Sequence, residues 1–363
     1  MAQIAVIGGG IAGAACALAL AHGGVPPVWL APPPLEGPKP GEHLSAAARP
    51  MLASLGAADL MDSDAHRPGH TLLSAWSGPT LAERNAILHL EGPPNVLNRR
   101  QFEADLAARA EEAGAQRIAA QMTDVQARGG AWQVQTADGE IEASLLIDAT
   151  GRAARVAGRT GCRFQADRLV GLHLSLRSMA APRPLTLIEA VRSGWWYLTV
   201  LPNGGAMLIF FTDSDLLPRA MTRDASDTLA RAKRLDHIGA FLDAAGLEPA
   251  EARPRLASAQ TSWIAPACGA GWIAIGDAAA AFDPVSSHGM TTALWTATTV
   301  AKAILAQDRS SVERYAKEVA LGVQDFLAGR RETYAQVRRF SDSPFWQRRA
   351  ASAPAEAAEV VVG

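Results

Sequence analysis

The chain has 363 residues, of which 48% are hydrophobic, and its 34 Lys and Arg residues nearly balance 36 Asp and Glu residues. This length suits about two domains, each with a sizeable core. The balanced charge argues against nucleic acid as a partner. Because no apolar run reaches the roughly 18 residues of a membrane helix and no basic leader opens the chain, we expect no membrane partner and a cytoplasmic location. Cys16, Cys162 and Cys268 stand far apart, so no metal site is expected.

The opening segment IAVIGGGIAGAACALALA predicts a strand over residues 4–7, a tight turn and a helix over residues 11–22. Its glycines follow the Gly-x-Gly-x-x-Gly pattern of a Rossmann-type dinucleotide site, in which the helix N-terminus holds a pyrophosphate. The residues expected at that pyrophosphate are Gly8, Gly10, Ile11, Ala12 and Gly13. The acidic residue that usually binds the ribose is missing, because Ala31 and Pro32 occupy the end of the second strand.

A second turn lies near the other end of the chain, in the segment WIAIGDAAAAFDPVSSHGM. Gly276 and Asp277 follow a short apolar strand, and a helix is expected to begin near Gly289. FAD is long enough to require both turns. Its ADP half would lie on the first turn, Asp277 would accept hydrogen bonds from the ribityl hydroxyls, and the positive end of the helix would face the flavin.

The elements between the two turns predict an α/β fold. Alternating strands dominate from about residue 171 to residue 211, so a β-sheet substrate domain of α+β character is expected to interrupt the Rossmann-type FAD-binding domain. We expect the FAD-binding domain to comprise residues 1–60, 95–155 and 257–308, the substrate domain residues 61–94 and 156–256, and a helical C-terminal segment residues 309–363.

These motifs resemble the FAD-dependent monooxygenases and tryptophan-halogenase-like flavoproteins, and the resemblance implies a fold of the group A flavin monooxygenase type. GPKPGEHLS looks like the strap that passes the flavin, LNRRQFEADL resembles the element whose arginine meets FAD, and IDATG resembles a strand and turn near the adenosine end. IGDAAAAFDP matches the flavin-binding pattern most specifically. The resemblance implies that FAD is bound by Gly41, Glu42, Arg99, Gly151, Gly276, Asp277, Asp283 and Pro284, and by Ser287, Gly289 and Met290 in the loop that follows.

Two further segments, EAVRSGWWYLTVLPNGGAMLIFFTD and YAQVRRFSDSPFWQRR, look like flavoproteins that hydroxylate a tryptophan of a partner polypeptide during quinone-cofactor maturation. This resemblance implies an FAD-dependent oxidoreductase that inserts oxygen into an aromatic ring through a flavin C4a-hydroperoxide. The substrate would be a polypeptide or a small aromatic molecule. Electrons would come from a pyridine nucleotide that visits the flavin or from a separate flavin reductase, because no second glycine motif is present.

Halogenation is disfavoured by three features of the sequence. The Trp-x-Trp-x-Ile-Pro signature of halogenases is only partly matched, no lysine occurs between Glu42 and Arg99, and His288 replaces a small hydroxyl residue. The remaining alternatives are a small-molecule aromatic hydroxylase, a reductase of isoprenoid double bonds and a flavin-binding assembly factor without turnover.

Four side chains are candidates for catalysis or substrate contact: His288 at the start of a helix, His43 in the strap, and Trp196 and Glu189 on substrate-domain strands. Each also has a structural interpretation, as a bonded histidine, a core aromatic residue or a solvated strand end. The arginines of the C-terminal segment have two interpretations, a solvated helix face or a docking surface for an acidic polypeptide.

Overall fold

The structure of the chain is a computed structural model that describes residues 3–33, 39, 41–85, 92–179 and 182–350. Its first sheet has six strands in the order β21-β22-β12-β1-β2-β8. The strands are β1 (Ile4–Ile7), β2 (Val28–Leu30), β8 (Gln116–Ile118), β12 (Leu145–Asp148), β21 (Cys268–Gly269) and β22 (Trp272–Ala274). All neighbours pair in parallel except β21 and β22, so the carboxyl ends of β1, β12 and β22 meet at one edge.

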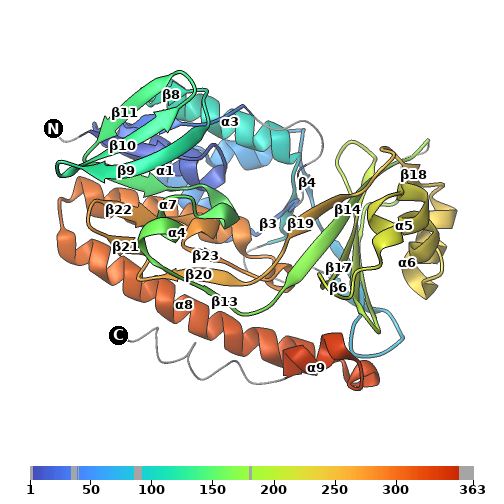
Figure 1. Cartoon of the computed structure of the whole chain (residues 1–363). Helices are drawn as coiled ribbons and strands as arrows, with labels where there is room; N and C mark the ends of the chain where they lie inside the picture. Colours follow the sequence, from blue (N-terminus) through green and yellow to red (C-terminus); the bar gives the residue numbers. More distant parts are fainter. Residues whose placement is uncertain (1–2, 34–38, 40, 86–91, 180–181, 351–363) are drawn as a thin grey trace.

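Helices cover this parallel sheet (Figure 1). The main ones are α1 (Ile11–His22), α3 (Arg99–Glu112), α7 (Gly289–Leu305) and α8 (Arg309–Ala335). Helix α1 is apolar on all sides and contacts both α3 and α7, as expected for a helix buried at the centre of a core. None of the helices among the described residues has the length and apolarity needed to cross a membrane.

A second, eight-stranded sheet lies at the other end of the molecule (Figure 1). Its strands run in the order β18-β14-β17-β16-β15-β5-β6, and β19 also pairs with β14. They are β5 (Thr71–Ala75), β6 (Ala82–Asn85), β14 (Leu169–Arg177), β15 (Thr186–Val191), β16 (Gly194–Val200), β17 (Ala206–Asp213), β18 (Glu248–Pro249) and β19 (Arg255–Ser258). This mixed architecture with a helical C-terminus confirms the expected fold class.

The two faces of the eight-stranded sheet pack against different helices. One face packs against α5 (Ala225–Ala232) and α6 (Asp236–Ala244). The other face carries an aromatic cluster that packs against the C-terminal end of α8 and against α9 (Pro344–Ala350). Because side chains alternate along β16, Trp196 joins the first face, while Trp195 and Tyr197 join the second.

Three small sheets and the short helices complete the described structure. The small sheets are formed by β9 (Met122–Arg128), β10 (Ala131–Thr136) and β11 (Gly139–Ala143), by β13 (Cys162–Gln165), β20 (Ser262–Ala265) and β23 (Ala280–Ala281), and by β3 (His43–Leu44), β7 (Asn95–Val96) and β4 (Arg67–Pro68). The short helices include α2 (Ala48–Ser54), α4 (Ala157–Thr160) and the 3-10 turns η3 (Gly151–Ala153), η5 (Gly276–Ala278) and η6 (Pro284–Ser286). The sheet of β3, β7 and β4 fixes the strap beside the eight-stranded sheet.

Candidate active site

The two glycine turns meet although they lie at opposite ends of the sequence. Gly276 follows β22 with a φ of +58°, and a Cβ added to it would stand 2.8 Å from the Cβ of Ala12 in the first turn of α1. Only glycine combines this backbone conformation with such a close approach. The amide of Gly276 donates to Thr296 Oγ1 of α7 at 2.9 Å, which holds the second turn against the helix.

The first glycine turn contains two kinds of glycine. A Cβ on Gly8 would lie 2.1 Å from the carbonyl oxygen of Ala149, and one on Gly13 would lie 2.0 Å from the carbonyl oxygen of Gly8, so packing requires both glycines. Gly10, at the N-cap of α1, has a φ of −85°, and no atom lies within 4 Å of the position of its missing Cβ. Neither packing nor strain explains this glycine, whereas a phosphate at the helix N-terminus does. The turn therefore fits the pyrophosphate of a dinucleotide.

Asp277 lies on η5, next to the turn that follows β12. Its Oδ2 is 3.4 Å from Nε of Arg152 in η3, and its side chain is 32% exposed. Partial burial raises the pKa of Asp277, while the charges of Arg152 and Arg99 oppose this rise. Gly151 begins η3 with a φ of +64°, and no atom lies within 4 Å of a Cβ placed there. Asp277 and Gly151 thus border the same side of the parallel sheet as the first glycine turn.

The loop between η5 and α7 divides into a buried and an exposed part. Asp283 is fully buried, and its Oδ2 accepts hydrogen bonds from Arg330 Nε at 3.0 Å and Tyr334 Oη at 2.9 Å. Its Oδ1 accepts from the Val285 amide at 3.0 Å, so both oxygens serve to fix the loop. Pro284 opens η6 after it.

The exposed part of the loop leads into α7. Ser287 has a φ of +55°, and His288 is an exposed N-cap residue whose side chain makes no capping hydrogen bond. At Gly289 a Cβ would meet open space, and Met290 turns into the core.

Arg99 fastens the strap to α3. Its Nη1 donates to the carbonyl oxygen of Gly41 at 2.6 Å, and its Nη2 pairs with Glu103 at 2.5 Å. Gly41 has a φ of +88°, and a Cβ there would stand 2.9 Å from the same guanidinium group. The strap therefore turns at Gly41 and directs Glu42 and His43 toward the interior.

A buried polar cluster lies between the strap and the eight-stranded sheet, and we call it the strap cluster. It consists of Glu42, His43, Thr186, Tyr197 and Thr199. Glu42 is 3% exposed, and its Oε1 has no hydrogen-bond partner among the described residues. Burial raises the pKa of Glu42 to about 7, although Arg99 and backbone donors oppose the rise. Burial, and secondly the neighbouring charge of Glu42, raise the pKa of Tyr197 well above its usual value.

His43 is held by two threonine hydroxyls. Its Nε2 lies 2.8 Å from Thr186 Oγ1 and 3.3 Å from Thr199 Oγ1, and the two hydroxyls are 2.8 Å apart. Burial lowers the pKa of His43 to about 4, and the charge of Arg67 acts in the same direction. The imidazole is therefore neutral near pH 7, and it forms hydrogen bonds without carrying a charge. Sequence reasoning missed Thr186 and Thr199, since only the pairing of β15 with β16 reveals them.

Two predicted substrate residues lie on the opposite face of the sheet. Trp196 stacks on Phe210 at a ring distance of 4.7 Å within the core that covers α5 and α6. Glu189 Oε2 accepts hydrogen bonds from the amide of Ile238 at 2.9 Å and from that of His237, so it caps the start of α6. This placement differs from our expectation that Trp196 and Glu189 contact substrate, and it assigns them packing and capping contacts instead.

Most arginines of the C-terminal segment form contacts within the chain. Arg330 pairs with Asp167 and Asp283, while Arg348 and Arg349 both pair with Asp213. The Nη2 of Arg339 donates to two backbone carbonyls, and Arg331, Arg338 and the paired Arg348 are exposed. The paired arginines therefore fasten α8 and α9 to the rest of the chain, chiefly to the eight-stranded sheet. Arg331 and Arg338 keep exposed positions without a carboxylate partner among the described residues.

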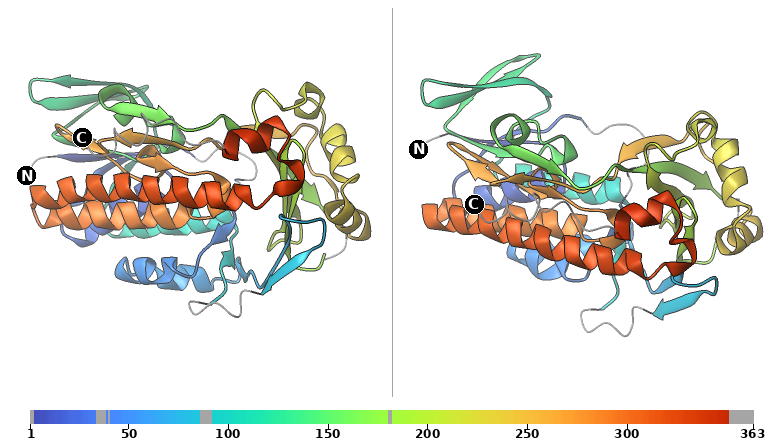
Figure 2. Two further views of the ribbon diagram at one scale, coloured as in Figure 1. Left: turned by 90° about the horizontal axis from the view of Figure 1, so that it is seen from below. Right: turned by 60° about the horizontal axis from the view of Figure 1, so that its bottom comes forward.

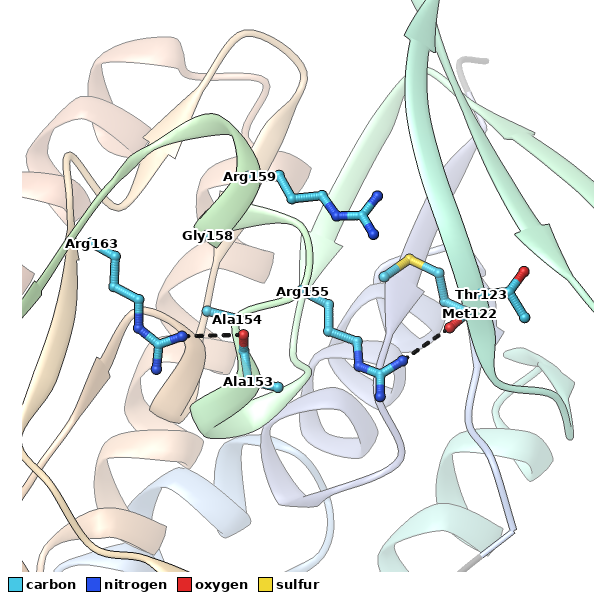
Figure 3. A pocket seen from close by; sticks show the side chains of 8 residues that line it. All are labelled: Met122, Thr123, Ala153, Ala154, Arg155, Gly158, Arg159 and Arg163. Carbon is cyan, nitrogen blue, oxygen red and sulfur yellow. Dashed lines mark hydrogen bonds between the residues drawn. The ribbon is translucent and has the colours of Figure 1, made fainter. Parts of the chain in front are cut away.

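A pocket of about 310 Å³ opens between β9 and η3 (Figure 3). Three arginines line it: Arg155 donates to the carbonyl oxygen of Met122 at 3.1 Å, Arg163 donates to a carbonyl oxygen of η3 at 2.7 Å, and Arg159 pairs with Asp124. Of these three arginines, only Arg159 has a carboxylate partner among the described residues, so the pocket carries positive charge beside the turn at η3. Such a surface favours phosphate groups. The described residues contain no group of three or more His, Cys, Asp or Glu that could hold a metal ion.

Comparisons with known proteins agree with this geometry. The family described as tryptophan halogenase matches residues 95–362. LodB of Marinomonas mediterranea, whose name describes an FAD-dependent oxidoreductase, is 28% identical in an alignment of 358 positions that covers 95% of each chain. The solved structure of the peptidyl tryptophan dihydroxylase QhpG has a TM-score of 0.79 at 22% identity and covers 96% of this chain and 79% of its own. The chondrochloren halogenase CndH has a TM-score of 0.86 at 21% identity, covering 99% and 88%.

Proposed function

We propose that this chain, which belongs to the tryptophan halogenase family of FAD-dependent flavoproteins, is a monooxygenase that hydroxylates the ring of a tryptophan in a partner polypeptide. When bound, FAD supplies the redox chemistry: the reduced cofactor, dioxygen and the substrate give the oxidised cofactor, water and the hydroxylated ring. The protein must hold the cofactor and the ring together, exclude water and place a proton-donating group beside them.

The residues that would hold FAD lie along one edge of the parallel sheet. Gly10 leaves room for the pyrophosphate at the N-terminus of α1, and the open space at Gly151 would lie on the adenosine side. Asp277 would bind the ribityl chain, and the strap that Arg99 fastens to α3 would pass the flavin. Among the residues named in the sequence, Asp283 would act indirectly by fixing the loop before α7.

The strap cluster would serve the chemistry. Glu42, with a pKa of about 7 and an unpaired Oε1, can release or take up a proton at that oxygen near neutral pH. The hydrogen bonds with the two threonines fix the neutral imidazole of His43. In this position His43 would orient the ring of the substrate or a water molecule. His288 is a candidate for substrate contact from the N-terminus of α7.

The observation that carries hydroxylation rather than halogenation is the composition of the strap cluster. A halogenase of this family needs a lysine beyond the strap, yet no lysine occurs between Lys39 and Lys233. Counted back from Pro202, the positions of the two tryptophans in the Trp-x-Trp-x-Ile-Pro signature are Tyr197 and Thr199, and both belong to the strap cluster. The site therefore offers hydroxyl groups where halogenases carry indole rings.

The polypeptide substrate is supported by one relative. QhpG, which shares the fold, acts on a tryptophan within a peptide, whereas other structures of the same fold are halogenases. The source of electrons would be a separate flavin reductase or a transiently bound pyridine nucleotide, because the sequence has one dinucleotide motif.

Reaction under labelled oxygen in the presence of bromide tests the proposal. The protein would be supplied with FAD, NADPH, a flavin reductase and a precursor polypeptide of a tryptophylquinone enzyme. Mass spectrometry should find ¹⁸O in the modified tryptophan and no bromine. A brominated product, or a hydroxylated product that lacks ¹⁸O because its oxygen derives from water, would refute the monooxygenase assignment.

A further inference from the structure

A groove of about 350 Å³ runs between α7 and α8 on the outer side of the cofactor turn. The two helices lie side by side along the molecule (Figure 2). The lining is mainly apolar and includes Ala280, Phe282, Trp295, Val319 and Leu321. Phe282 and Trp295 are only partly buried, so the groove presents aromatic surface to whatever enters it.

Two residues of α8 at this groove are unusual for the helix of a folded chain. Leu321 is 57% exposed, one of three large hydrophobic side chains in the described structure that remain so accessible. Gly322 stands in the middle of the helix, where glycine costs roughly 0.5–1 kcal/mol relative to alanine. No atom lies within 4 Å of a Cβ placed at Gly322, so packing within the chain does not require the glycine. Its absence of a side chain leaves the groove open.

The charged side chains that line the groove are both acidic. Glu318 and Asp325 flank Gly322 on α8, both are exposed, and neither forms an ion pair with another described residue. The groove thus offers two free carboxylates on either side of an apolar depression. A partner with the opposite charge and an apolar side chain would complement it.

The groove also adjoins the cofactor turn. Thr296 lines the groove and its Oγ1 accepts the hydrogen bond from the amide of Gly276. Thr292, another lining residue, is one helical turn, or about 6 Å, from His288 at the N-terminus of α7. A chain held in this groove would therefore reach the N-terminus of α7 within a few residues.

We propose that this groove binds a cationic segment of the polypeptide substrate outside the tryptophan that is modified. The identity of the segment as part of the substrate rests on the proposed function. Glu318 and Asp325 are seven residues apart, or about 10 Å along the helix. An extended chain advances about 3.3 Å per residue, so the segment carries Lys or Arg residues three positions apart. An apolar side chain between them enters the space above Gly322.

Fluorescence anisotropy with two labelled peptides tests the groove without any turnover. The first probe is Ser-Gly-Lys-Leu-Ser-Lys-Gly-Ser, and the second carries Glu in place of both lysines. The FAD-loaded protein should bind the first and not the second, and added salt should weaken the binding because the carboxylates are exposed. Glu318→Lys combined with Asp325→Lys should weaken binding at least tenfold. Gly322→Leu should do the same, since the leucine fills the depression and suits a helix.

The matched control is Glu313→Lys combined with Glu332→Lys, which changes the net charge equally on exposed positions of α8 outside the groove. It should bind the probe within twofold of the unmodified protein. Equal weakening by the control, equal binding of both peptides, or unchanged affinity in Gly322→Leu would overturn the proposal. A concentration-dependent dimer in sedimentation that Gly322→Leu abolishes would also overturn it, because the occupant would then be a second copy.

Joining the first probe to a tryptophan-containing peptide separates the two proposals. Probe binding without hydroxylation would contradict the proposed function and leave the groove in place. Hydroxylation with the same kcat/KM in Gly322→Leu as in the unmodified protein would contradict the groove as a substrate site and leave the function in place.

Discussion

Substituting Gly10 by alanine should separate folding from FAD binding. Gly10 has a φ that alanine adopts readily, and no atom lies within 4 Å of the new methyl group. The loss of stability should be limited to the difference between glycine and alanine at an N-cap, at most about 1 kcal/mol. In a protein of this size such a change lowers the Tm by no more than about 4 °C.

FAD binding should suffer much more, because the methyl group occupies the space in which the pyrophosphate approaches the helix. Loss of that contact by only about 1.4 kcal/mol weakens affinity tenfold, and we expect at least this effect. Gly13→Ala is the matched comparison. Its Cβ would stand 2.0 Å from the carbonyl oxygen of Gly8, so the turn itself must shift at a cost of about 1–3 kcal/mol.

Thermal denaturation without FAD and calorimetric titration with FAD measure the two effects on the same preparations. Gly10→Ala should melt near the unmodified protein and bind FAD at least tenfold more weakly, whereas Gly13→Ala should be impaired in both measurements. If Gly10→Ala binds FAD with unchanged affinity, the open space at Gly10 does not receive the cofactor and the reasoning is refuted.

Three further predictions concern the site and its support. Asp277→Asn should weaken FAD binding in a titration, while Trp196→Phe, on the far face of the sheet, should leave it unchanged; equal effects would contradict the assignment of the two sides. His43 has a folded pKa of about 4, below its usual 6.5, so its contribution to stability is present above pH 6.5 and is lost as the pH falls toward 4. Between pH 7 and pH 4.5 the unmodified protein should lose roughly 2 kcal/mol more unfolding free energy than the His43→Gln variant, as measured by urea unfolding. The same pH dependence in both proteins would argue against a buried neutral imidazole. Arg330→Met leaves the carboxylates of Asp167 and Asp283 without their cationic partner and should cost about 3–5 kcal/mol of unfolding free energy, whereas exposed Arg331→Met should cost less than about 0.5 kcal/mol; similar costs would show that the buried ion pairs are not important.

Local sequence patterns predicted the two glycine turns and their flanking strands and helices well. The glycine spacing at Gly8, Gly10 and Gly13 and the Gly-Asp turn at Gly276 each lie between a strand and a helix, so their conformations are fixed over a few residues. Their convergence follows from the rule that parallel strands present their carboxyl ends at one edge of a sheet.

The substrate side depended on contacts that no local pattern contains. Alternation along β16 predicted that Trp196 faces away from its neighbours, but a period of two does not say which face meets the cofactor. The partners of His43 are Thr186 and Thr199, more than 140 residues away, and they become visible only when the strap docks on the sheet. The burial of Arg330 was equally hidden from local patterns. It depends on ion pairs with Asp167 and Asp283, which lie in other parts of the sequence.

The central claim is tested most directly by comparing free tryptophan with a tryptophan in a polypeptide under one set of conditions. The protein, FAD, NADPH, a flavin reductase and air would be incubated with either free tryptophan or a precursor polypeptide of a tryptophylquinone enzyme, and the products analysed by mass spectrometry. The account predicts that one tryptophan of the polypeptide gains about 16 Da, or about 32 Da after two additions, only when oxygen is present, while free tryptophan is left unchanged. Modification of free tryptophan at an equal or higher rate, or a chlorinated polypeptide when chloride is added, would contradict it.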